Sequence, residues 1–135
     1  FEIDGRFHLL YRGMQKRYAN QGVGIAVSTD LLHWERLSNT PVINVRQEIA
    51  SMAVAETNTG FVGISQPMNL ANRTYWYSND LHQWHQGPPV NFRSSVRAET
   101  ISNPFLSDGK WTVLYEQNDR IYRAILQPSA NAIQN

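Results

Sequence analysis

Two short segments with the same pattern carry the charged residues that could do chemistry. Arg46 and Glu48 occupy the first segment, and Arg97 and Glu99 occupy the second, 51 residues further along the chain. Residues two apart in a β-strand point to the same face, so each segment would present a guanidinium and a carboxyl group together. Two such strands side by side would bring two carboxyl groups to one pocket. Carboxyl groups about 5 to 9.5 Å apart can cleave a glycosidic bond, one of them acting as an acid.

The same four residues also have a structural interpretation. Arg–Glu pairs are common inside proteins, and here they could form a ring of salt bridges between strands. The two arginines could instead bind hydroxyl or carboxylate groups of a ligand, or hold the glutamates ionised. The residues themselves therefore leave catalysis, ligand binding and a structural role open.

A second pattern shows how these segments would be positioned. The phrase Ser-x-Asp-Leu-x-x-Trp occurs at 28–34 and again at 78–84, a period of 50 residues that is typical of stacked repeats. In each copy the Asp can accept backbone N–H groups within a turn. We expect the Leu and Trp to point back into the layer between sheets, so packing is favoured over sugar stacking for Trp34 and Trp84.

Short alternating runs around these turns predict an all-β protein. Asp4-Gly5 and Asp108-Gly109 each precede an aromatic-rich run, which is a hairpin signal because Gly tolerates a positive φ. Alternation places Tyr75 and Tyr77 on one face of their strand and Trp76 on the other. Four antiparallel strands per repeat are typical of a β-propeller blade. We predict about three blades in a single domain, the first blade lacking its first strand, with units at about 1–44, 45–92 and 93–127 and a tail at 128–135.

Composition excludes several classes of protein. A net charge of +1 over 135 residues gives no basic surface for a nucleic acid, and no apolar run is long enough to cross a membrane. His82 and His85 lack the further ligands of a zinc site, so neither a metal nor another cofactor is expected. No leader segment is visible, which slightly favours the cytoplasm while leaving the location unknown.

The residues of the first unit resemble a known superfamily. The run from Asp4 to Tyr11, then Gly24 to Ser28, then Asp30 to Glu35, is similar to a blade of the five-bladed β-propeller glycoside hydrolases. That group includes arabinanases, β-xylosidases, invertases and mannoside phosphorylases. The likeness covers nearly all of the first unit, is weaker in the other two, and implies a short form with about three blades.

The resemblance implies roles for the charged segments. In that superfamily acidic residues of the innermost strands line one mouth of the central channel, which places Arg46, Glu48, Arg97 and Glu99 there. Glu99 falls where the general acid often lies, and Glu48 where an Asp commonly orients the substrate or tunes the acid. Asn103 stands at a position that other members fill with polar residues, and is a candidate for ligand binding. The usual base or nucleophile would precede Phe1 and is not in this sequence.

Three blades leave two open edges, whereas propellers close into rings. Two copies could join around a twofold axis as a six-bladed homodimer, or the chain could be part of a larger propeller. Because the acidic set is incomplete, we expect binding of a glycan or small polar ligand at the channel mouth. A glycoside hydrolase using Glu99 with Glu48, and a non-catalytic interaction module, remain the alternatives, so the sequence leaves open whether the protein is an enzyme.

Overall fold

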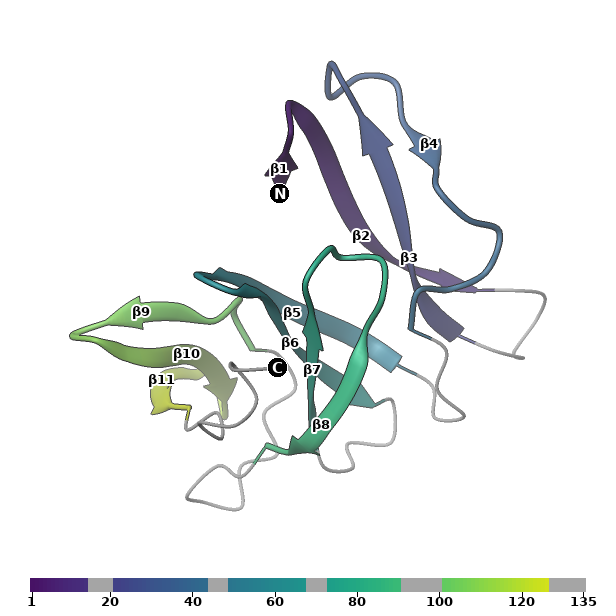
Figure 1. Cartoon of the computed structure of the whole chain (residues 1–135). Coiled ribbons are helices and arrows are strands. Elements are labelled where there is room, and N and C mark those ends of the chain that lie inside the picture. The colour runs from purple at the N-terminus through teal and green to yellow at the C-terminus, as the bar shows by residue number, and fades with distance from the viewer. Residues whose placement is uncertain (15–20, 44–48, 68–72, 91–100, 127–135) are drawn as a thin grey trace.

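The computed structural model describes residues 1–14, 21–43, 49–67, 73–90 and 101–126. Within these ranges every regular element is a β-strand, and the strands form three antiparallel sheets (Figure 1). The all-β prediction and the prediction of about three blades are confirmed. The first sheet has the order β1-β2-β3-β4, the second β5-β6-β7-β8 and the third β11-β10-β9. We call these sheets blade one, blade two and blade three.

The strand bounds follow the repeat. Blade one contains β1 (Glu2–Ile3), β2 (Arg6–Met14), β3 (Gln21–Ser28) and β4 (Glu35–Arg36). Blade two contains β5 (Ile49–Thr57), β6 (Gly60–Pro67), β7 (Thr74–Ser78) and β8 (His85–Pro89). Blade three contains β9 (Phe105–Ser107), β10 (Lys110–Gln117) and β11 (Arg120–Ile125). The prediction that blade one lacks its first strand needs correction, because β1 pairs with β2 as a two-residue strand at that place.

Tight turns join the strands at one end of each blade. Asp4 and Gly5 both have a positive φ, of 50° and 72°, and so do Asp108 and Gly109, at 52° and 69°. Two consecutive residues with positive φ form the type I′ turn that matches the twist of a hairpin, and the sequence Asp-Gly favours it. The equivalent hairpin of blade two closes at Gly60, which has a φ of 135°.

The repeated Ser-x-Asp-Leu-x-x-Trp phrase forms the same corner twice. In blade two, Asp80 Oδ1 accepts hydrogen bonds from the backbone N–H groups of His82 and Gln83, both at 2.8 Å. In blade one, Asp30 Oδ1 accepts equivalent bonds from Leu32 at 2.9 Å and His33 at 2.8 Å. The serine hydroxyl donates to the Asp carboxylate in both corners. The predicted role of the Asp is confirmed.

The indole of each corner tryptophan is fixed by the leucine that precedes it by three residues. Trp84 donates from Nε1 to the carbonyl oxygen of Leu81 at 2.8 Å, and Trp34 donates to that of Leu31 at 3.1 Å. Both leucines have a left-handed backbone, with φ of 64° at Leu31 and 65° at Leu81. Leucine rarely adopts this conformation because its Cβ approaches the carbonyl oxygen.

The two corners differ in burial. Leu81 is 0% exposed and packs with Trp84 between blades one and two, as predicted for this copy. Leu31 and Trp34 are exposed instead, which corrects the prediction for the first copy. The difference arises because blade one covers the corner of blade two, whereas no described element covers the corner of blade one.

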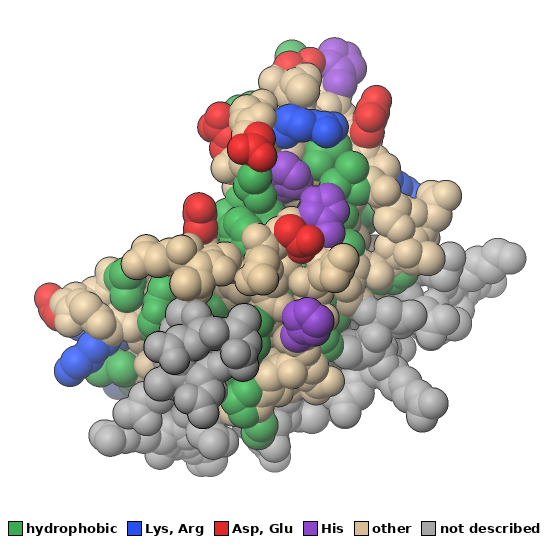
Figure 2. Space-filling view, in the orientation of Figure 1, with side chains coloured by type: hydrophobic (Ala, Val, Ile, Leu, Met, Phe, Trp, Pro, Cys, Tyr) green, Lys and Arg blue, Asp and Glu red, His purple; other side chains and the backbone are tan. Residues whose placement is uncertain are grey.

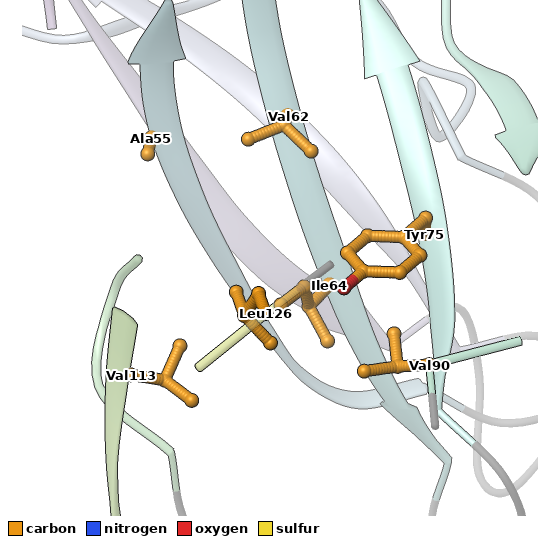
Figure 3. Packing of buried hydrophobic residues seen from close by; sticks show 7 residues of the cluster. All are labelled: Ala55, Val62, Ile64, Tyr75, Val90, Val113 and Leu126. Carbon is orange, nitrogen blue, oxygen red and sulfur yellow. The ribbon is translucent and has the colours of Figure 1, made fainter. Parts of the chain in front are cut away.

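Two apolar layers hold the three blades together. The layer between blades one and two contains Val23 and Ile25 of β3 against Val54, Phe61 and Trp76 of blade two. The layer between blades two and three is shown in Figure 3, with Val113 and Leu126 facing the side chains of blade two. Members from blade two are Ala55, Val62, Ile64, Tyr75 and Val90. Tyr75 and Tyr77 therefore face blade three while Trp76 faces blade one, as alternation predicted.

Candidate functional site

The two ends of the blades differ in which strands they connect. At one end lie the first hairpin turn of each blade and the two Ser-x-Asp-Leu-x-x-Trp corners. At the other end, Met14 pairs with Gln21, and Ile49 pairs with Pro67. The chain also passes from β4 to β5 and from β8 to β9 at this second end, which we call the loop end, and the tight turn at Asn118-Asp119 lies there too. β5, the first strand of blade two, also begins there, at Ile49.

The two predicted catalytic glutamates and the two predicted arginines lie shortly before β5 and β9 in the sequence. Glu48 immediately precedes Ile49, the first residue of β5, while Glu99 precedes Ile101, which bridges to Tyr115 of β10. Arg46, Glu48, Arg97 and Glu99 themselves lie outside the described residues. Their roles stay predictions.

Asn103, the predicted ligand-binding residue, lies within the described part. Its side-chain Oδ1 accepts a hydrogen bond from the backbone N–H of Val54 at 3.1 Å. This bond joins the segment that leads into β9 to the middle of β5 in the neighbouring blade. Asn103 is exposed, and its amide nitrogen could still donate to a ligand. Its ligand-binding role stays a prediction, beside the structural role that the bond shows.

Ser102 holds the same segment against blade three. Its backbone N–H donates to the carbonyl oxygen of Leu114 at 2.8 Å, and its hydroxyl accepts from the N–H of Leu114 at 3.0 Å. The hydroxyl also donates to the carbonyl oxygen of Asn103 at 2.9 Å. Ser102 and Asn103 thus fix this stretch of chain to both blades, which sets the direction in which it enters β9.

Arg73 is a buried cation at the loop end that the sequence did not single out. It directly precedes β7, and its carbonyl oxygen accepts a hydrogen bond from Val90 N–H at 2.8 Å. The residue is only 7% exposed, and burial lowers the pKa of its guanidinium. The ordinary value is so high that the group keeps its charge at neutral pH. Arg73 therefore places a positive charge at the end of the blade where β5 begins.

One signal in the sequence could have identified Arg73. Arg73 lies one residue before β7 and two residues before Tyr75, so continuing the strand pattern back by one residue puts it on the face that Tyr75 and Tyr77 share. That face packs against blade three. An arginine in line with one buried and one half-buried tyrosine at the start of a central strand is a charged group that the protein has to accommodate internally.

Other polar groups of the described residues offer less. His8 and His82 meet edge to face with their ring centroids 6.0 Å apart, where blade one contacts blade two. Among the residues that the structure describes, no three His, Asp or Glu side chains lie close enough to hold a metal ion. The described ranges also contain no helix long and apolar enough to span a membrane.

Comparisons with known proteins identify similar folds. No family model and no curated protein sequence matches the chain. Sucrose-6-phosphate hydrolase from Lactobacillus gasseri superposes with a TM-score of 0.64 at 14% identity, over 85% of this chain and 26% of that one. A protein from Bacteroides ovatus ATCC 8483, classed provisionally as a glycoside hydrolase, superposes with a TM-score of 0.67 at 21% identity, over 92% of this chain and 44% of that one. The chain thus spans less than half the length of either structure, and the likeness concerns the fold.

Proposed function

We propose that this protein binds a carbohydrate at the loop end of its blades. The observation that carries the proposal is topological: β5 and the described chain that leads into β9 both start at the loop end, where the chain passes from one blade to the next. In sequence, Glu48 directly precedes Ile49, and Glu99 lies two residues before Ile101. Their carboxylates would accept hydrogen bonds from sugar hydroxyl groups. The fold likeness to sucrose-6-phosphate hydrolase supports a sugar as the ligand class.

Positive charge at the same end supports this proposal. Arg73 is buried there, and Arg46 and Arg97 each lie two residues before a glutamate in sequence. A guanidinium group favours the ionised form of a nearby carboxyl group and can itself donate several hydrogen bonds to hydroxyl or phosphate oxygens. Polyols and sugar phosphates are therefore the ligands to test first.

A binding assay with matched variants tests the proposal. Thermal unfolding of the wild-type chain is measured with arabinose, xylose, fructose, mannose and fructose 6-phosphate at millimolar concentration. At least one should raise the unfolding midpoint, because a ligand that binds only the folded state stabilises it. Glu48→Gln and Glu99→Gln should each raise, at least tenfold, the ligand concentration that is needed for the same shift. Glu56→Gln is the control, since Glu56 is exposed on β5 near its hairpin turn, at the opposite end from Ile49.

The same variants separate binding from hydrolysis. If Glu99 serves as a general acid with Glu48 as its partner, the wild type releases nitrophenol from aryl arabinosides, xylosides or fructosides. Glu99→Gln would then abolish release while the fold stays intact. Absence of any sugar-induced shift, with a folded protein, would contradict the proposed function and leave the interaction module as the better account.

A further inference from the structure

Two histidines from different blades meet where blade one packs against blade two. His8 lies on β2, and His82 lies in the corner between β7 and β8. Their rings meet edge to face, with the ring centroids 6.0 Å apart and the ring planes at 75° to each other. Figure 2 shows histidine side chains gathered on the face of the molecule where these two blades meet. The pair therefore lies across the junction of two sheets.

Each histidine is connected to the apolar layer between the two blades. On β2, His8 and Leu10 point to the same side, and Leu10 packs in that layer, so both side chains face blade two. His82 directly follows Leu81, which is fully buried in the same layer. A force between the two rings consequently acts on the docking of blade one onto blade two.

His8 is half-buried, and its tautomer is fixed by the backbone. Its Nδ1 lies 3.1 Å from the carbonyl oxygen of Arg6, and because a carbonyl only accepts, Nδ1 carries the hydrogen. Burial is the largest cause that lowers the pKa of His8; the bond to Arg6 opposes it, whereas the charge of His82 lowers the pKa further. The docked blades therefore disfavour a proton on His8.

The charged groups around the pair differ in sign between the two blades. On blade one, the amino group of Phe1 and the guanidinium of Arg6 both lower the pKa of His8. On blade two, Asp80 lies in the same corner as His82, and a charge on His82 lowers the pKa of Asp80. Among the described residues, the charges that act on His8 are thus positive, and the carboxylate of the corner acts on His82.

We propose that the contact between His8 and His82 makes the docking of blade one onto blade two sensitive to pH, so that the two blades loosen as the pH falls. Two imidazolium rings at this separation repel each other, whereas uncharged rings pack edge to face. Since the pKa of His8 is lowered in the folded protein, the stability of the docked state is present above about pH 6.5 and is lost as the pH falls below it. The contact lies at the end of the blades opposite the loop end, and its role does not depend on sugar binding.

NMR titration of the histidine ring protons tests whether the two rings sense each other. In His82→Gln the titration midpoint of His8 should rise by about 0.5 to 2 pH units, the effect of removing one charge about 6 Å away at an effective dielectric constant of about 80 to 20. A midpoint of His8 that stays in place would overturn the proposal.

Thermal unfolding tests whether the charges act on stability. The unfolding midpoint of the wild type should fall between about pH 7.5 and about pH 5, and it should fall less in His8→Gln, which lacks the disfavoured proton site. Removing His82 as well should reduce the fall no further, because the repulsion needs both rings. Salt at about 0.5 M should weaken the pH dependence of the wild type, since charges near the surface are screened.

Quenching of tryptophan fluorescence by acrylamide reports the layer itself. Trp76 and Trp84 pack in the layer between blades one and two. If acid loosens the docking, the quenching constant of the wild type should rise about twofold between about pH 7.5 and about pH 5, well below the temperature of unfolding. The rise should be smaller in His8→Gln. Equal quenching of the wild type at both pH values would overturn the proposal.

His85→Gln is the matched control. His85 is exposed at the start of β8, three residues after His82, and pairs there with Tyr77 of its own blade. This variant should show the pH dependence of the wild type in unfolding and in quenching. The proposal would be wrong if His8→Gln kept the full pH dependence, or if His85→Gln reduced it as much as His8→Gln does.

Discussion

Replacing Gly60 by alanine should destabilise the protein more than the same change at any other hairpin turn. Gly60 begins β6 with a φ of 135°, a region of backbone space that is essentially restricted to glycine. A Cβ at this position would lie 2.5 Å from the carbonyl oxygen of Ser78 and 3.0 Å from Cα of Asn79. Both are backbone atoms of the corner that contains Asp80, so neither can move without disturbing that corner.

The magnitude follows from two contributions. Forcing an L-residue into such a conformation costs about 1–3 kcal/mol, and relieving a backbone contact of this kind adds on the order of 1–3 kcal/mol. We therefore expect Gly60→Ala to lower the free energy of unfolding by about 3 kcal/mol or more, a large share of the roughly 5–15 kcal/mol of an ordinary domain.

Gly109→Ala is the matched control. Gly109 also has a positive φ, of 69°, but no atom lies within 4 Å of its built Cβ. Only the left-handed backbone then opposes alanine, at a cost of about 1–2 kcal/mol. Urea unfolding followed by tryptophan fluorescence measures both variants. Equal losses in the two variants would refute the argument, because the contact with Ser78 would then contribute nothing.

Three further predictions address other features. Burial opposes ionisation of Asp80, but hydrogen bonds from Gln83, His82 and Ser78 outweigh it and hold the pKa of Asp80 below its ordinary value. The stability that the ionised carboxylate contributes should therefore be present above about pH 4 and be lost as the pH falls below that value. Below about pH 4 the thermal unfolding midpoint should decline less steeply in Asp80→Asn than in the wild type, and parallel curves would show that this carboxylate is not responsible. Trp76→Phe removes the Nε1 donor that reaches Ser65 Oγ at 2.9 Å in a buried site and should cost about 1–3 kcal/mol in urea unfolding, whereas Trp76→Phe combined with Ser65→Ala should recover part of that loss. Asn103→Ala leaves the N–H of Val54 without its acceptor and should lower stability by about 1 kcal/mol; amide hydrogen exchange at Val54 should accelerate more than at Ala55, and unchanged exchange would count against this bond.

The blades could be predicted from sequence because their signals are local. Asp4-Gly5 specifies a turn through two residues, and Asp80 forms its corner through bonds to residues two and three positions on. Burial of the corner could not be predicted in the same way. Leu31 and Leu81 occupy identical positions in the repeat, and only the presence of a neighbouring blade makes one exposed and the other buried.

The candidate site was harder to predict for a related reason. Glu48 and Glu99 were identified by a repeated spacing, but both lie outside the described residues, so their roles stay predictions. Asn103 was selected because the resemblance places polar residues at its position, and its bond to Val54 joins residues 49 positions apart, which no local pattern reports. Arg73 escaped notice because a single arginine before a strand usually lies at the surface.

The corner that occurs twice also bears on how the chain folds. Its hydrogen bonds link residues only two or three positions apart, and its geometry is the same whether the leucine is buried or exposed. Such a corner can form on the microsecond timescale of a hairpin, before any contact between blades exists. Each blade would then acquire its shape independently, and the slower step would be the docking of one finished sheet onto the next. Folding intermediates of this protein should therefore contain native corners and native strand pairs, with the interblade layers still hydrated.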